Sequence, residues 1–142
     1  MAIALINYRL LILVILILLT AACREDIIEP DTFVGTVNEP VQINRLNSYT
    51  FIIHAQNMSV NVINNTYIAS FTSRISITIV DHSSGYVSIN VIDREENSRF
   101  SYFGNEDENL FTESIIGYVP SRIGIRAVDF SGKLKIVVTK TL

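Results

Sequence analysis

The chain has 142 residues and a formal net charge of −3; 49% of its residues are hydrophobic and 18% are charged. This apolar fraction excludes a disordered chain, and the length allows one ordinary domain. Acidic residues outnumber basic ones and no basic cluster is present, which argues against a nucleic-acid partner.

The N-terminal residues are predicted to form an export signal. Arg9 precedes an unbroken aliphatic run from Leu10 to Leu19, and the small residues Thr20, Ala21 and Ala22 follow it. A charge, an apolar run of about 7–15 residues and small residues at a cleavage point are the layout of such a signal. The run is shorter than the roughly 20 apolar residues that span a bilayer. An uncleaved N-terminal anchor is the alternative interpretation.

Cys23, the only cysteine, follows these small residues directly. The stretch "LTAAC" resembles the lipobox of bacterial lipoproteins, although Thr20 stands where a leucine is usual. The resemblance covers residues 1–23 and implies that the signal, residues 1–22, is removed and that the Cys23 sulfur carries lipid. An ordinary secretory signal is the alternative. Lipidation would also protect a thiol that oxidation would otherwise threaten in an exported protein.

The next segment, residues 23–32, is predicted to be an acidic tether. Glu25 and Asp26 are similar to the signal that some Bacteroidota lipoproteins use to reach the outer face of the outer membrane; a solvated linker explains the same residues equally well. The sequence therefore predicts a lipid-anchored protein of the bacterial cell envelope, at the outer membrane, with the periplasmic and the surface face both left open.

Residues 33–142 are predicted to form one all-β domain, an antiparallel β-sandwich of immunoglobulin-like or jelly-roll type. Apolar and polar residues alternate with period two, which is typical of half-buried strands. Asp, Ser and Gly in 81–85 and 129–132 predict turns of two hairpins, and a turn or two of helix is expected near 105–111. The hairpin strands are Ile75–Val80 with Val87–Ile92 and Arg122–Val128 with Lys133–Thr139. The other predicted strands are Thr32–Val37, Val41–Leu46, Tyr49–Ala55, Ser59–Ile63, Arg99–Phe103 and Ile115–Val119.

No catalytic, cofactor or metal motif is found in the sequence. His54 and His82 lack ligand partners at metal-binding spacing. The acidic stretch "NEDEN", 105–109, is predicted to be a solvent-exposed loop, with a calcium site as the alternative, and "DREEN", 93–97, a solvated hairpin tip. Four tyrosines on or beside strands are expected to pack rather than to stack on sugars: Tyr67, Tyr86, Tyr102 and Tyr118.

These features favour a non-enzymatic lipoprotein of the envelope, attached to the membrane through Cys23. Its small β-sandwich would serve as a binding or structural module for an envelope protein or a glycan. The alternative is an accessory or inhibitor lipoprotein that acts on an envelope or secreted hydrolase through the loop at 105–109.

Overall fold

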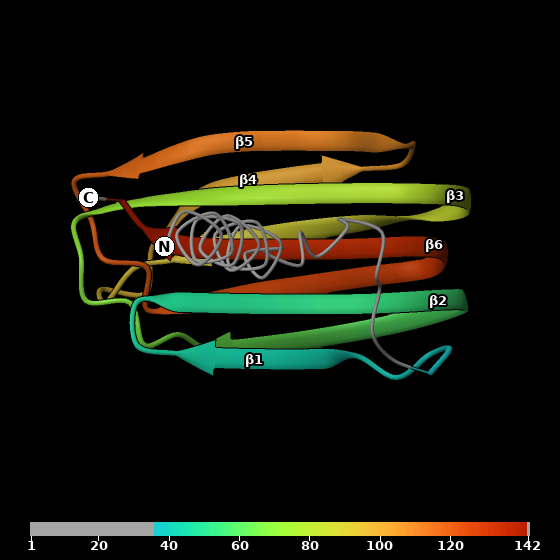
Figure 1. The fold of residues 1–142 in the computed structure, drawn as a ribbon, viewed down its shortest axis with the longest axis horizontal. Helices are drawn as coiled ribbons and strands as arrows, with labels where there is room; N and C mark the ends of the chain where they lie inside the picture. Colours follow the sequence, from blue (N-terminus) through green and yellow to red (C-terminus); the bar gives the residue numbers. More distant parts are fainter. Residues whose placement is uncertain (1–35, 142) are drawn as a thin grey trace, which may run out of the picture. The chain divides into compact units, whose positions relative to one another are not determined.

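The computed structural model describes residues 36–141, which form one antiparallel sheet of six strands (Figure 1). The all-β antiparallel prediction is confirmed. The described residues contain no helix, hence none that could cross a membrane. The signal segment, Cys23, the tether and the start of the predicted domain at residue 33 lie outside the described residues. The strands are β1 (Val41–Arg45), β2 (Ser48–Asn65), β3 (Thr72–Ile92), β4 (Ser98–Gly104), β5 (Glu108–Ile116) and β6 (Arg122–Lys140).

Three strands are long enough to belong to two layers. β2, β3 and β6 have 18, 21 and 19 residues, whereas an ordinary strand has about 5–6. Figure 1 shows each of them turning back on itself at the right-hand side of the view. β1 pairs with the first half of β2, and β5 with the first half of β3, whereas β4 pairs with the second half of β3. One folded sheet therefore supplies both layers of the sandwich.

The strands bend at residues that favour a left-handed backbone. Asn57, Asp81 and Asp129 have φ values of 49°, 56° and 48°, and Asn and Asp adopt this conformation at less cost than other non-glycine residues. Gly85 has φ 74°, and a Cβ there would collide with the backbone of Val128 and Asp129. The sheet register also shifts at the bends of β2 and β3, as expected of β-bulges.

Hydrogen bonds between side chains and backbone join the bends of neighbouring strands. Ser59 Oγ donates to Asp129 Oδ1 at 3.1 Å and accepts from the Asp129 N–H at 2.9 Å. Ser84 Oγ donates to the Asp129 carbonyl at 3.0 Å, and the Asn57 N–H donates to Ser131 Oγ at 2.8 Å. These bonds satisfy backbone groups that the bulges remove from the regular ladder. We refer to residues 56–59, 81–85 and 129–132 as the bend end.

The predicted hairpin turns at 81–85 and 129–132 are wrong, because both segments are bends inside a continuous strand. Ile77 pairs with Ile136 of β6 and Phe111 of β5, whereas Ile89 pairs with Ile125 of β6 and Tyr102 of β4. The predicted helical turn near 105–111 is also wrong, since β5 begins at Glu108. The predicted strand at Ile115–Val119 overlaps only the last two residues of β5.

The core lies between the two layers and is built by the predicted alternation. Tyr49 is fully buried, and its hydroxyl accepts a hydrogen bond from Asn64 Nδ2 at 3.0 Å; burial raises the pKa of this hydroxyl to about 12. Tyr49 and Asn64 lie on opposite sides of the β2 bend, so this bond joins the layers. The strands β3 and β6 supply most of the core: Ile75, Ile77, Ile79, Val87, Ile89, Val91, Ile123, Ile125, Ala127, Leu134, Ile136 and Val138.

Candidate functional site

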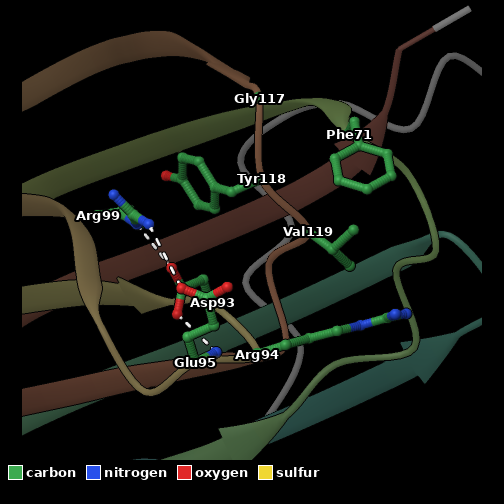
Figure 2. A pocket seen from close by; sticks show the side chains of 8 residues that line it. All are labelled: Phe71, Asp93, Arg94, Glu95, Arg99, Gly117, Tyr118 and Val119. Atoms are coloured by element: carbon green, nitrogen blue, oxygen red, sulfur yellow. Dashed lines mark hydrogen bonds and ion pairs between the residues drawn. The ribbon is translucent and has the colours of Figure 1, made fainter.

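A pocket of about 250 Å³ lies among three loops at the end of the sandwich away from the bends. The loops are 66–71 between β2 and β3, 93–97 between β3 and β4, and 117–121 between β5 and β6. Figure 2 shows the side chains that line it: Phe71, Asp93, Arg94, Glu95, Arg99, Tyr118 and Val119, with Gly117. We call this end of the domain the loop end.

The three loops are tied together by backbone hydrogen bonds. The Ser121 N–H donates to the Ile92 carbonyl at 2.9 Å, and the Thr66 N–H donates to the Ser121 carbonyl at 2.9 Å. The Gly117 N–H donates to the Phe71 carbonyl at 2.9 Å. Ser121 Oγ donates to the Asp93 carbonyl at 2.6 Å. The pocket walls are therefore fixed by the fold before any ligand binds, which reduces the entropy that binding costs.

Asp93 organises the hairpin tip between β3 and β4. Its buried carboxylate accepts hydrogen bonds from the Glu95 N–H at 2.8 Å, the Asn97 N–H at 2.9 Å and Arg99 Nε at 2.6 Å. The Arg99 guanidinium, helped by these backbone donors, lowers the pKa of Asp93 to about 2. The ion pair therefore presents fixed charges to the pocket at neutral pH.

Aromatic rings form the opposite wall. Figure 2 shows the rings of Phe71 and Tyr118 along the upper side of the pocket, and Asp93 with Arg94 along the lower side. The Phe71 side chain is 66% exposed, whereas Tyr118 is half-buried, and burial raises the pKa of its hydroxyl. Arg94 has no ion-pair partner among residues 36–141. Apolar ring faces beside fixed donors and acceptors suit a small ligand that has both an apolar face and a polar rim.

The histidines and the acidic loop lie elsewhere. His54 faces outward on β2, and His82 lies in the β3 bend, where Nε2 is 3.1 Å from the Gly85 carbonyl oxygen. Residues 105–107 form the exposed turn between β4 and β5, and Asp107 Oδ1 accepts a hydrogen bond from the His82 N–H at 2.8 Å. In the part of the chain that the structure describes, no three potential metal-ligating side chains converge.

Sequence reasoning missed the residues that build the pocket. The hairpin at 93–97 was expected, but Asp93 is buried rather than solvated; an Asp that opens a tight turn is a recognisable Asx-turn signal. Tyr102 packs against Phe111 with ring centroids 5.0 Å apart, as expected of a packing tyrosine. Tyr67 does not pack in this way, because it is 63% exposed. Tyr86 packs against Phe103, which is itself exposed, with ring centroids 5.2 Å apart.

No protein-family model matches this chain, and no curated protein matches its sequence. Among solved structures, it is similar to a Bacillus endospore appendage described as a disulfide-linked pilus, with 11% identity and a TM-score of 0.43 over 77% of this chain and 96% of that one. An accessory secretory protein structure from Streptococcus pneumoniae matches at 9% identity and TM-score 0.37, over 72% and 86% of the two chains. A protein of Neisseria meningitidis matches at 14% identity and a TM-score of 0.34, over 76% of this chain and 89% of that one. These values carry no functional assignment.

Proposed function

We propose that the protein is a lipid-anchored binding module of the bacterial cell envelope whose loop-end pocket takes a sugar unit of an envelope glycan. The observation that carries this proposal is the exposed Phe71 ring facing the fixed Asp93–Arg99 ion pair across one small pocket. Pyranose rings have an apolar face that stacks on aromatic rings and a rim of hydroxyl groups that bond to charged side chains. Both kinds of group are present here, at fixed positions.

The anchor rests on the sequence. Cys23 follows an apolar run and two alanines in the arrangement of a lipobox, and two or three acyl chains on one cysteine hold a protein stably on a bilayer. All of the core described above lies in residues 36–141. Removal of a signal peptide therefore takes nothing from that core, and the processed chain keeps the pocket.

Glycan binding is tested with matched aromatic variants. The processed protein should be retained by at least one member of a panel of immobilised envelope oligosaccharides. Phe71→Ala should weaken binding about tenfold, because ring stacking contributes roughly 0.5–1.5 kcal/mol beyond the area it buries. Phe103→Ala is the control, since Phe103 is 61% exposed but lies outside the pocket.

Two results would contradict the pocket proposal. One is equal weakening by Phe71→Ala and Phe103→Ala; the other is that no oligosaccharide is retained. If envelope extract instead yields a hydrolase bound through residues 105–109, the accessory or inhibitor function replaces glycan binding. Circular dichroism of both variants checks that their fold is unchanged.

Lipid anchoring is tested at Cys23. Labelled palmitate should enter the wild-type protein and not Cys23→Ser, and the variant should fail to be processed at this position. Normal cleavage of Cys23→Ser, with the product on the same membrane, would refute the lipoprotein proposal. A plain signal peptide or an uncleaved N-terminal segment would then replace it.

A further inference from the structure

The second half of β2 is an open edge of the sheet. In the layer that contains β1, the strand order is β1-β2-β6-β3-β5, whereas the other layer has only β2-β6-β3-β4. Residues 59–65 of β2 therefore pair with β6 on one side and with no strand of residues 36–141 on the other. A hollow of about 380 Å³ lies at this edge, lined by Ser59, Val60, Asn61, Arg126, Ala127 and Val128.

The backbone of this edge is directed outward at alternate residues. At its end, the Thr66 N–H donates to the carbonyl of Ser121, the residue before β6. The neighbouring Asn65 carbonyl instead accepts from Asn44 Nδ2 of β1 at 2.7 Å, on the side of β2 away from β6. These directions alternate along an antiparallel strand. Through the unbroken register of residues 60–65, the odd-numbered residues therefore direct their N–H and C=O groups away from β6.

The other edges of the sheet carry charges that this edge lacks. β1 carries Arg45, β4 carries Arg99, and β5 carries Glu108 and Glu113. Residues 59–65 read "SVNVINN", without a charge, proline or glycine. Proteins usually block exposed edges with such residues because a bare edge pairs readily with another strand. An uncharged edge of this length is therefore suited to receive a strand.

We propose that two copies of the chain pair antiparallel through this edge, with a two-fold axis at Val62. This axis places residue 59 of one copy opposite residue 65 of the other, so the whole open edge is paired. It also places Asn61 opposite Ile63 of the second copy. Both residues direct their N–H and C=O groups outward, so they exchange hydrogen bonds as a hydrogen-bonded pair. Val62 then faces Val62 of the second copy in a non-hydrogen-bonded pair, with Cα atoms about 4.5 Å apart.

The apolar side chains of the edge match across this axis on both faces of the sheet. Val62 is only half-buried in one copy, and it packs against its counterpart on the core side. On the outer face, Ile63 is 62% exposed and pairs with Gly124 of β6, which has no side chain to cover it. Ile63 of the second copy lies diagonally across the axis, at the spacing of about 7–8 Å that long side chains reach. Pairing therefore covers apolar surface that a single copy exposes.

Charge favours a second copy over a charged strand of another protein, which would find no opposite charge on residues 59–65. Self-pairing puts no like charges opposite each other. The nearest unpaired charge is Arg126 on β6, which is exposed, pairs with Asn61 and has no ion-pair partner among residues 36–141. At the level of Arg126, the second copy has Gly124 three strand spacings away, or about 14 Å. Because this exceeds the Debye length of about 8 Å at physiological salt, repulsion between the two copies is screened.

Disulfide trapping tests the paired edge in the full chain in detergent micelles. Two short edges bury less than the roughly 1,200 Å² of a standard interface, so the dimer is weak and must be trapped. Cys23→Ser removes the only native cysteine. In that chain, Val62→Cys should give a disulfide-linked dimer, because a Cα separation of about 4.5 Å lies within the range that a disulfide spans.

Ile63→Cys, also in the Cys23→Ser chain, is the matched control. Ile63 is more exposed than Val62, so chance collisions would cross-link it faster. In the proposed dimer its counterpart is about 7–8 Å away, too far for an unstrained disulfide, and Val62→Cys should cross-link at least about tenfold faster. Equal or faster cross-linking of Ile63→Cys would overturn the proposal, as would the absence of cross-linking in both variants.

Hydrogen exchange of the wild-type chain at high and low concentration gives a second readout that needs no variant. The amides of Asn61 and Ile63 should be protected at high concentration and lose protection on dilution, while the core amides of Ile77 and Ile125 stay protected. Protection that dilution leaves unchanged would mean that the same chain covers the edge, and fast exchange at both concentrations would mean that the edge is free. Either result overturns the proposal. Neither test depends on lipidation or on the pocket, so failure here is distinguishable from failure of the proposed function.

Discussion

Ile125→Ala should destabilise both layers of the sandwich together. Ile125 is 1% exposed and belongs to the layer that contains β4. The substitution removes three carbons, about 2.4 kcal/mol of transfer free energy at roughly 0.8 kcal/mol each, and the cavity raises the loss to about 2–5 kcal/mol. Because β2, β3 and β6 each run through both layers, we expect the free energy of unfolding to fall without partial melting.

Urea unfolding followed by far-UV circular dichroism and tyrosine fluorescence measures this effect. With a slope of roughly 1.5 kcal/mol per molar urea, a loss of about 3 kcal/mol lowers the midpoint by about 2 M. Ile77→Ala, in the other layer, should do the same, and Ile63→Ala should have little effect because Ile63 is 62% exposed. Ile77→Asp or Ile125→Asp should abolish folding, since a marginal domain cannot offset an unpaired buried carboxylate. Two separate transitions in either alanine variant would refute the shared-strand reasoning.

The pKa of Asp93 lies at about 2, below its ordinary value of 3.8, so its ion pair stabilises the fold above about pH 4 and is lost as the pH falls towards 2. The free energy of unfolding of the wild type should thus fall more steeply between pH 5 and 2 than that of Asp93→Asn, because the wild type has one more carboxylate that takes up a proton on unfolding. Equal pH dependence of the two proteins would count against the stabilising role of the Asp93 ion pair. Millimolar calcium should leave the melting temperature unchanged, because Asp107 already accepts the His82 N–H, and a rise of several degrees that Asp107→Asn removes would mean a calcium site at 105–109. Gly85→Ala should lower the melting temperature more than Gly117→Ala: both glycines have positive φ, but a Cβ meets backbone only at Gly85. An equal fall in melting temperature for the two variants would mean that the strain of a positive φ, and not the Cβ collision at Gly85, causes the destabilisation.

Alternation alone located most strand positions, because burial of one face of a strand depends on residues two apart. The prediction Val41–Leu46 differs from β1 by one residue, and the inward set Ile123, Ile125 and Ala127 is correct. The bends were misread as hairpin turns because Asp, Ser and Gly supply positive φ in either setting. Only the pairing partners of the following residues distinguish a bend from a turn, and these are far away in the sequence.

The pocket could be predicted only in part for a similar reason. Asp93 and Arg99 lie in one hairpin, so their ion pair is a local feature. Phe71 and Tyr118 come from two other loops, which meet this hairpin only because β3 and β6 run side by side through both layers. No local pattern in the sequence marks that meeting. The packing prediction covered four tyrosines, of which Tyr118 lines the pocket, and it made no statement about Phe71.

The bends also constrain how the length of the chain can vary. Side chains alternate strictly along a strand, so one inserted residue moves every later side chain in that strand to the other face. An insertion at 56–59, 81–85 or 129–132 would exchange the inward and outward residues of half a strand, and the buried set of one layer would be lost. Insertions at 66–71, 93–97 or 117–121 fall in loops between strands, so they leave the inward and outward faces of the strands in both layers unchanged. Related chains should therefore vary in length in the loops around the pocket while conserving the spacing across the bends, so that the loop end diversifies on a fixed scaffold.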